Sequence, residues 1–321
     1  MLGVSRIILV KTSSLGDVLH NLPVASDIRR HLPDARMDWA VEESFAALPA
    51  LHPAVERVIP VAMRRWRKSW LASRGEMRGV CQTLRDAHYD LALDTQGLLK
   101  SALIARCAHA VRCGYDWGSA REPLASLFYD RKYAVDKNLH AVQRNRKLAG
   151  LALGYEPQGA PDYGIRAPEL ALPWLPATPY VVLLHATSRD DKLWDEANWI
   201  ALGGRLEQMG LRAILPWGSE REKLRAERLC AAIPGAICPH RLDLNEAAAV
   251  LGRARAVVGV DTGLSHLAAA LDVPTVGIYT ATDPGLTGLY AGERAVNLGG
   301  KGTPPSVTDV LDTLQKMGCH A

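Results

Sequence analysis

A regular alternation of short apolar runs with helical patterns constrains the fold of this chain more than any other feature. Such runs recur along the whole length, and segments with apolar residues three and four apart separate them. The expected strands are Arg6–Val10, Met37–Val41, Val58–Pro60, Leu91–Asp94, Tyr180–His185, Arg212–Pro216, Ala256–Val260 and Thr275–Tyr279. The expected helices include Pro23–His31, Met77–Ala87, Ser101–Ala108, Asn198–Gln208, Arg221–Ile233 and Asn245–Leu251. The alternation predicts an α/β chain whose parallel sheets carry helices on both faces.

Length and proline distribution predict two domains. The chain has 321 residues, more than one hydrophobic core usually serves. Six of its 19 prolines lie in residues 156–179, where no long helix can form. We therefore expect two similar α/β domains, residues 1–165 and 166–321, with packing of the C-terminal helix on the first domain kept open.

Composition places the chain among ordinary globular proteins, with 48% hydrophobic and 22% charged residues. No apolar run approaches the roughly 18–20 residues that span a bilayer, and the N-terminus has no signal-peptide pattern. A cytoplasmic protein is the expectation. The six cysteines form no Cys-x-x-Cys pair, so we expect reduced thiols rather than a disulfide framework. No metal-ligand spacing is present, and we expect no tightly bound metal.

The net charge of +4 is unevenly distributed, because the first half is basic and the second half slightly acidic. A basic domain suggests an anionic partner. Nucleic acid, an anionic membrane surface and an anionic glycolipid all fit this balance.

A strand, a tight turn and a helical pattern follow one another in residues 256–271. Asp261, Thr262 and Gly263 form the turn, and His266 lies four residues after Thr262. The amides of a first helical turn attract anions, commonly phosphate, and a glycine lets them approach closely. The alternative is that Asp261 or Thr262 only caps the helix.

Two other polar clusters of the second half also follow expected strands. Thr187, Ser188 and Lys192 offer two hydroxyls and an ammonium to a phosphate. Glu222 could bind ribose hydroxyls, or it could be a solvated glutamate in the first turn of a helix. Trp194 and Trp199 are interpreted as packing residues.

In the first half, the segment Lys11-Thr-Ser-Ser-Leu-Gly-Asp17 follows the first strand. Asp17 at such a turn could act as a general base on a hydroxyl, or it could cap a helix. Pro23 disfavours helical geometry at Leu22, so we expect the helix after this turn to be kinked or delayed.

Two further segments of the first half are rich in arginine and tryptophan. In residues 63–70, the cations Arg64, Arg65, Arg67 and Lys68 accompany apolar residues at helical spacing. That segment suits either a membrane surface or a solvated helix with buried tryptophans. The loop 116–123, which contains Arg121, has the composition of a binding site more than that of a core.

Taken together, these motifs resemble glycosyltransferase family 9, the lipopolysaccharide heptosyltransferases, and within it the heptosyltransferase I group. The resemblance rests on the motifs at 10–20 (Val-Lys-Thr-Ser-Ser-Leu-Gly-Asp-Val-Leu-His), 94–98 (Asp-Thr-Gln-Gly-Leu), 120–124 (Ala-Arg-Glu-Pro-Leu), 185–192 (His-Ala-Thr-Ser-Arg-Asp-Asp-Lys), 261–266 (Asp-Thr-Gly-Leu-Ser-His) and 282–286 (Thr-Asp-Pro-Gly-Leu). One departure is Thr280-Ala281, where that family often has a Gly-Pro-type turn.

The resemblance implies a GT-B architecture of two Rossmann-like domains facing each other across a central cleft. It also implies transfer of L-glycero-D-manno-heptose from ADP-heptose, with inversion, to the Kdo of Kdo2-lipid A at the cytoplasmic face of the inner membrane. Neither a metal nor nucleic acid takes part in that reaction.

Site residues carry over by motif. The catalytic pair would be Asp17, as base, and Lys192. The donor site in the second domain would comprise Thr187, Ser188, Lys192, Glu222, Asp261, Thr262, Gly263 and His266. The acceptor side, in the first domain, would comprise Ser13, Ser14, Arg64, Arg65, Arg67, Lys68 and Arg121.

Other activities fit the same architecture. A heptosyltransferase for a later core acceptor would differ in the acceptor-side residues. A sugar-nucleotide epimerase or hydrolase would convert the donor alone, and a nucleotide- or lipid-binding protein would show no turnover. A nicotinamide dehydrogenase is disfavoured, because no Gly-x-Gly-x-x-Gly follows the first strand.

Overall fold

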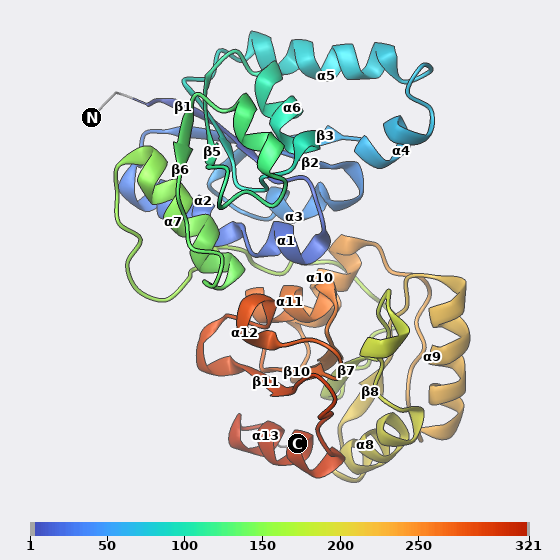
Figure 1. Cartoon of the computed structure of the whole chain (residues 1–321). Coiled ribbons are helices and arrows are strands. Elements are labelled where there is room, and N and C mark those ends of the chain that lie inside the picture. Colours follow the sequence, from blue (N-terminus) through green and yellow to red (C-terminus); the bar gives the residue numbers. More distant parts are fainter. Residues whose placement is uncertain (1–3, 320–321) are drawn as a thin grey trace. The chain divides into compact units, whose positions relative to one another are not determined.

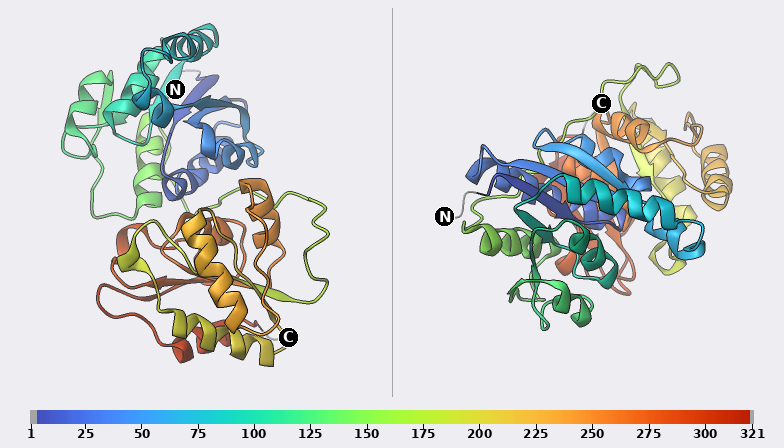
Figure 2. Two further views of the ribbon diagram at one scale, coloured as in Figure 1. Left: turned by 90° about the vertical axis from the view of Figure 1, so that its right-hand side faces the viewer. Right: turned by 90° about the horizontal axis from the view of Figure 1, so that it is seen from above.

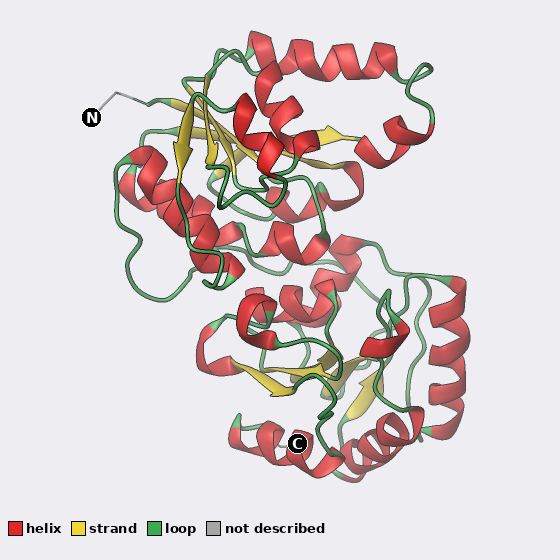
Figure 3. Ribbon diagram, in the orientation of Figure 1, coloured by secondary structure: helices red, strands yellow, loops and turns green. Residues whose placement is uncertain are grey.

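The computed structural model describes residues 4–319, and these form two compact units that divide between Ile165 and Arg166 (Figure 1). In each unit every strand pairs in parallel with its neighbours, and helices flank the sheet (Figures 1 and 3). The parallel α/β architecture that the sequence predicts is confirmed.

Unit 1 holds a six-stranded sheet in the order β3-β2-β1-β4-β5-β6. Its strands are β1 (Arg6–Val10), β2 (Arg36–Glu42), β3 (Val55–Val61), β4 (Leu91–Asp94), β5 (Val111–Tyr115) and β6 (Arg131–Tyr133). Its helices are α1 (Leu15–Leu19), α2 (Leu22–His31), α3 (Ala47–Ala50), α4 (Met63–Lys68), α5 (Arg74–Asp86), α6 (Leu99–Cys107) and α7 (Ala141–Leu153). The helix after β1 breaks at His20–Asn21, and Pro23 lies in the first turn of α2, as expected.

The central strands of unit 1 are apolar on both faces. Ile8 and Val10 of β1 share a core cluster with Leu84 of α5 and Ile104 of α6. Successive side chains of a strand point to opposite faces, so Ile7 lies on the other side of the sheet, where it is also fully buried. Burial on both sides explains why these strands read as continuous apolar runs.

Unit 2 holds a five-stranded sheet in the order β11-β10-β9-β7-β8. Its strands are β7 (Tyr180–Leu184), β8 (Arg212–Ile214), β9 (Ala256–Val260), β10 (Thr275–Tyr279) and β11 (Ala295–Gly299). Its helices are α8 (Glu196–Gln208), α9 (Glu220–Ala232), α10 (Leu244–Gly252), α11 (Gly263–Ala270), α12 (Pro284–Thr287) and α13 (Val307–Lys316). Figure 2 gives two further views of these elements.

Packing residues of unit 2 lie where the sequence indicates. Trp194 and Trp199 are buried in the core cluster, edge to face with ring centroids 5.1 Å apart. Val310 and Leu314 of α13 join the same cluster. The C-terminal helix α13 thus packs on the core of its own unit.

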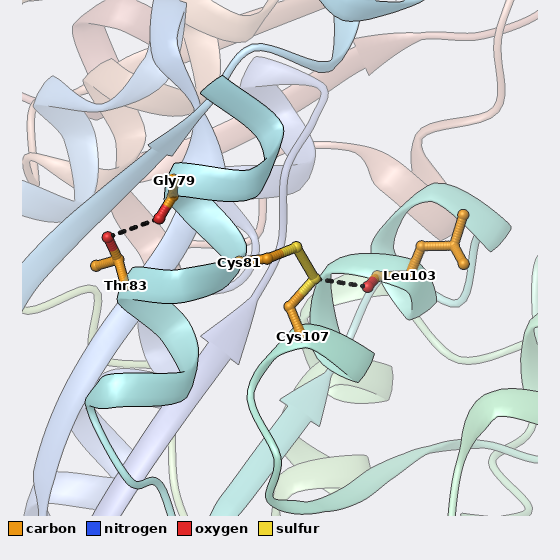
Figure 4. The surroundings of a disulfide bond; sticks show 5 residues. All are labelled: Gly79, Cys81, Thr83, Leu103 and Cys107. Carbon is orange, nitrogen blue, oxygen red and sulfur yellow. Dashed lines mark hydrogen bonds between the residues drawn. A yellow bond between two sulfur atoms is a disulfide. The ribbon is translucent and has the colours of Figure 1, made fainter. Parts of the chain in front are cut away.

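The expectation that all six cysteines are reduced is wrong. Cys81 of α5 and Cys107 of α6 form a disulfide, with Cα atoms 5.0 Å apart (Figure 4). The two residues are 26 positions apart, and only the packing of α5 against α6 brings them together. Cys113, Cys230, Cys238 and Cys319 are free.

Candidate active site

Each sheet has one point where neighbouring strands lead their helices to opposite faces, and ligands bind outside the carboxyl ends of the strands there. In unit 1 this switch point lies between β1 and β4, and in unit 2 it lies between β7 and β9. The polar motifs at 11–17 and 94–98 follow β1 and β4, and those at 185–192 and 261–266 follow β7 and β9. Topology therefore gathers the sequence motifs into one half-site per unit.

Gln96 joins the two loops of the unit 1 half-site. Its Oε1 accepts from the Thr12 amide at 2.6 Å and from Thr12 Oγ1 at 2.8 Å, and its Nε2 donates to the Ser13 carbonyl at 2.6 Å. The backbone amide of Gln96 in turn donates to Oδ1 of the buried Asp94 at 2.8 Å. These bonds fix the loop that precedes α1.

Lys11 is a buried cation beneath that loop. Its Nζ donates to the Thr95 carbonyl at 2.9 Å and to Asn145 Oδ1 at 3.4 Å. Burial lowers the pKa of Lys11 to about 8, although the carboxylates of Asp17 and Asp94 oppose the shift. Lys11 therefore still carries its positive charge at neutral pH.

Asp17 lies in the first turn of α1 and contacts both Ser14 and Arg121. Its Oδ2 accepts from the Ser14 amide at 2.9 Å and from Ser14 Oγ at 3.1 Å, which is a capping contact. The Arg121 guanidinium is 3.4 Å from the same oxygen. Burial alone would raise the pKa of Asp17, but Lys11, Arg121 and the Ser14 hydrogen bonds outweigh it and lower that pKa. The Asp17 side chain therefore caps α1 and is also an ionised carboxylate.

Lys100 of α6 belongs to the same neighbourhood, although sequence reasoning missed it. Its Nζ donates to Ser13 Oγ at 2.6 Å. Burial lowers its pKa, and the charges that act on it include those of Arg64 and Asp17. The structure therefore brings Ser13, Ser14, Asp17 and Arg121 together and places Arg64 within electrostatic reach. Gln96 could be found from the sequence because it is a polar residue that follows an expected strand, whereas no local pattern indicated Lys100.

Helix α4 agrees with the interpretation of residues 63–70 as a solvated helix at Trp66 but not at Trp70, and the membrane-surface interpretation stays a prediction. Trp66 is buried and donates to Glu76 Oε2 at 2.9 Å, as in a solvated helix with an inward tryptophan. Arg65 pairs with Glu43 at 3.0 Å and with Glu76 at 2.7 Å, so its charge is already matched. Arg67 and Lys68 are exposed, and Trp70 is 56% exposed.

In unit 2, Asp261 is the centre of the half-site. Thr187 Oγ1 donates to the Asp261 carbonyl at 3.0 Å and so joins the loops after β7 and β9. Lys192 Nζ lies 2.6 Å from Asp261 Oδ2, which also accepts from Thr282 Oγ1 at 2.8 Å. The Asp261 carboxylate orients a cation and a hydroxyl instead of capping α11.

The first turn of α11 receives no side-chain cap from its N-cap residue. Thr262 is the N-cap residue, and its side chain makes no cap hydrogen bond. Ser265 instead donates to the Val260 carbonyl at 2.8 Å, and His266 is 7% exposed. The capping alternative for Thr262 is therefore not realised, and the amides near Gly263 remain suited to an anion.

A pocket of about 390 Å³ lies between the loop after β7 and the start of α9. Thr187, Ser188, Ser219 and Glu222 are among the side chains that line it. Glu222 Oε2 accepts from the Gly218 amide at 2.7 Å, which orients its carboxylate at the pocket wall. Asp261 contacts the pocket residue Thr187 and pairs with Lys192, but neither residue lines the pocket. The other predicted donor residues that do not line it are Thr262, Gly263 and His266.

Within residues 4–319, no three His, Cys, Asp or Glu side chains gather as a metal ion would need. No helix in the same range is long and apolar enough to cross a membrane.

Comparison with known proteins identifies relatives along most of the chain. Residues 77–313 match the model of glycosyltransferase family 9 (heptosyltransferase). The chain is 50% identical to lipopolysaccharide heptosyltransferase 1 of Salmonella typhimurium (strain LT2), over 89% of this chain and 91% of that protein.

Solved structures agree with that match. A structure described as E. coli heptosyltransferase WaaC with ADP has a TM-score of 0.90 and 45% identity, and the match covers 97% of this chain and 99% of that one. A second structure of that enzyme, with ADP-2-deoxy-2-fluoro heptose, has a TM-score of 0.85 and 43% identity at the same coverage.

Proposed function

The chain belongs to glycosyltransferase family 9, and from that premise we propose that it moves L-glycero-D-manno-heptose from ADP-heptose to the Kdo of Kdo2-lipid A. It is a GT-B-type glycosyltransferase that transfers heptose in lipopolysaccharide core synthesis. The proposal adds the identity of the acceptor, the roles of single residues and a place at the cytoplasmic face of the inner membrane. A relative that binds ADP-2-deoxy-2-fluoro heptose supports the donor.

The single observation that carries the mechanism is the position of Asp17 beside Lys11 and Arg121 at the unit 1 switch point. Its lowered pKa keeps the carboxylate ionised at neutral pH, as a base must be. In the proposed step Asp17 takes the proton of an acceptor hydroxyl, and that oxygen attacks the anomeric carbon from the side opposite the diphosphate. The new C–O bond forms as the bond to ADP breaks, through an oxocarbenium-like transition state.

The unit 2 half-site receives the negative charge that grows on departing ADP. We assign that work to Lys192, to the hydroxyls of Thr187 and Ser188, and to the amides of the first turn of α11. Asp261 orients Lys192, and Glu222 binds the ribose hydroxyls. His266, on the first turns of α11, completes the donor site with Thr262 and Gly263.

The acceptor carries phosphate and Kdo carboxylate groups, and the basic side chains of unit 1 suit it. We assign Arg64, Arg67, Lys68 and Arg121 to those anions, with Ser13 and Ser14 near the reacting hydroxyl. Arg65 is assigned a supporting place, because Glu43 and Glu76 already neutralise it.

Product analysis by mass spectrometry tests this function directly. The purified protein is incubated with ADP-heptose, with and without Kdo2-lipid A. We expect ADP and the heptosylated lipid only when the acceptor is present. Conversion of the donor alone at full rate would instead identify an epimerase or a hydrolase.

The role of Asp17 is tested by Asp17→Asn, with Asp34→Asn on the exposed turn after α2 as the matched control. Asp17→Asn should lose about 10²–10⁴-fold in kcat and still bind ADP, because a general base contributes that much. Near-full turnover of this variant would remove Asp17 from the mechanism.

A further inference from the structure

A second pocket, of about 650 Å³, opens on unit 1 between α4, α5, α6 and the start of β5. Its wall is largely apolar and includes Met63, Met77 and Leu103. The Cys81–Cys107 disulfide forms part of the same wall, and Figure 4 shows Leu103 on the helix turn beside Cys107. The proposed transfer reaction does not use this pocket.

Cationic side chains surround the apolar wall. Arg85, Arg106 and Arg112 all line the pocket, whereas no aspartate or glutamate is among its lining residues. Arg112 pairs with Asp130 at 2.6 Å. Arg85 and Arg106 are exposed and have no ion pair within the described part of the chain. An apolar hollow with unmatched positive charge at its edge suits an amphiphile with an anionic head.

The connection between α4 and α5, two helices that contribute residues to the pocket wall, has the same character. Leu103 is 48% exposed at the pocket wall, and Trp70 and Leu71 are 56% and 63% exposed in the connection between α4 and α5. The Arg74 guanidinium lies over the Trp70 ring, 4.2 Å from its centroid. Exposed tryptophan and leucine among arginines are typical of surfaces that rest at a membrane interface.

From this combination we propose that the pocket binds one acyl chain of an anionic membrane phospholipid. The chain enters between α5 and α6 along Met77 and Leu103, and Arg85 and Arg106 hold the phosphate of the headgroup. Trp70 and Leu71 lie in the interface beside it. This site goes beyond the proposed function, which needs only the acceptor, and it identifies where a phospholipid would attach the enzyme to the bilayer.

Vesicle binding with matched variants tests the proposal on the full chain. The probes are vesicles of phosphatidylglycerol with phosphatidylcholine and vesicles of phosphatidylcholine alone. Leu103→Glu and the double variant Arg85→Glu/Arg106→Glu should each reduce partitioning onto the anionic vesicles by about tenfold or more. Leu151→Glu is the control, because Leu151 is 43% exposed on α7 of the same unit and does not line the pocket.

A photoreactive acyl chain locates the lipid. Phosphatidylglycerol with a diazirine near the end of its chain should crosslink to α5 and α6, around Met77 and Leu103. Crosslinks confined to residues 70 and 71 would overturn the proposal, because the lipid would then touch the surface without entering the pocket. Equal loss of binding in Leu103→Glu and Leu151→Glu would overturn it too, as would self-association of the chain through this face without lipid binding.

Turnover separates this proposal from the proposed function. Leu103→Glu should keep the wild-type kcat on an acceptor stripped of its acyl chains, since the residue lies outside the two half-sites. Failure of heptose transfer in the wild type would leave the vesicle result unaffected.

Discussion

The ammonium of Lys192 lies 2.6 Å from the carboxylate of Asp261, although 69 residues separate them in the chain. Both side chains are less than a fifth exposed, so the pair is poorly screened by solvent. The contact fixes the position of a cation at the carboxyl end of the β7–β9 switch point.

Lys192→Met should weaken ADP binding by about 10–100-fold, the loss of one charge-assisted contact. The variant also leaves the Asp261 carboxylate without its cation, beside the proposed diphosphate site. The double variant Lys192→Met/Asp261→Asn should therefore recover part of the lost affinity, a coupling that calorimetric titration of ADP measures. Lys316→Met on exposed α13 is the control. Strict additivity of the two single variants would contradict the coupling.

Lys11→Met should move the acid limb of the kcat/KM profile to higher pH. Lys11 is the strongest of the groups that lower the pKa of Asp17, so its removal lets that pKa rise. More of the proposed base is then protonated at a given acidic pH. Rate measurements across mildly acidic pH check this, with Lys132→Met as the exposed control. An unchanged limb would mean that Asp17 does not set it.

Unfolding free energy should fall as the pH drops from about 6.5 to about 4. His185 and His52 are buried, and burial lowers the pKa of each from 6.5 to about 4. In that window the unfolded chain binds more protons than the folded one, so acid favours unfolding. Below about pH 4, each histidine has lowered the free energy of unfolding by roughly 3 kcal/mol.

His185→Phe should flatten this pH dependence by about half, since His52 keeps its share. Urea unfolding at a series of pH values is the measurement. His88→Phe, at an exposed position, is the control and should leave the slope as it is.

Reduction of the Cys81–Cys107 disulfide should lower the stability of unit 1 by about 2–4 kcal/mol, the usual effect of opening a loop of this length. Dithiothreitol should shift the unfolding transition of the wild type and leave a Cys81→Ser/Cys107→Ser variant unmoved. Thiol titration of the denatured chain should count four reactive groups without reductant and six with it. Six thiols in both conditions would contradict the bond.

Local sequence predicted the buried centre of each sheet, because β1, β4, β9 and β10 are apolar on both faces and have polar residues only at their ends. It missed β5, where Arg112 and Gly114 interrupt the apolar run, β6, whose Arg-Lys-Tyr run is exposed at the sheet edge, and β11, which is only half-buried. An edge strand needs few apolar contacts, so its residues carry little pattern.

The same distinction holds for the site. Asp17, Thr187 and Asp261 could be selected from sequence because polar residues follow strands where parallel sheets bind ligands. The Lys100–Ser13 contact and the disulfide could not, since each joins segments whose proximity depends on how helices pack. The charge state of Asp17 likewise depends on Lys11 and Arg121, which surround it only in the folded unit.

Gln96 and Thr187 tie the loops of their own switch points by short hydrogen bonds, so each half-site is assembled inside a single unit. The two half-sites can therefore change independently of each other. Substitutions in the loop beside Asp17 would leave the hydrogen bonds around Asp261 in place, so a change on the proposed acceptor side of unit 1 would not require a change on the proposed donor side of unit 2.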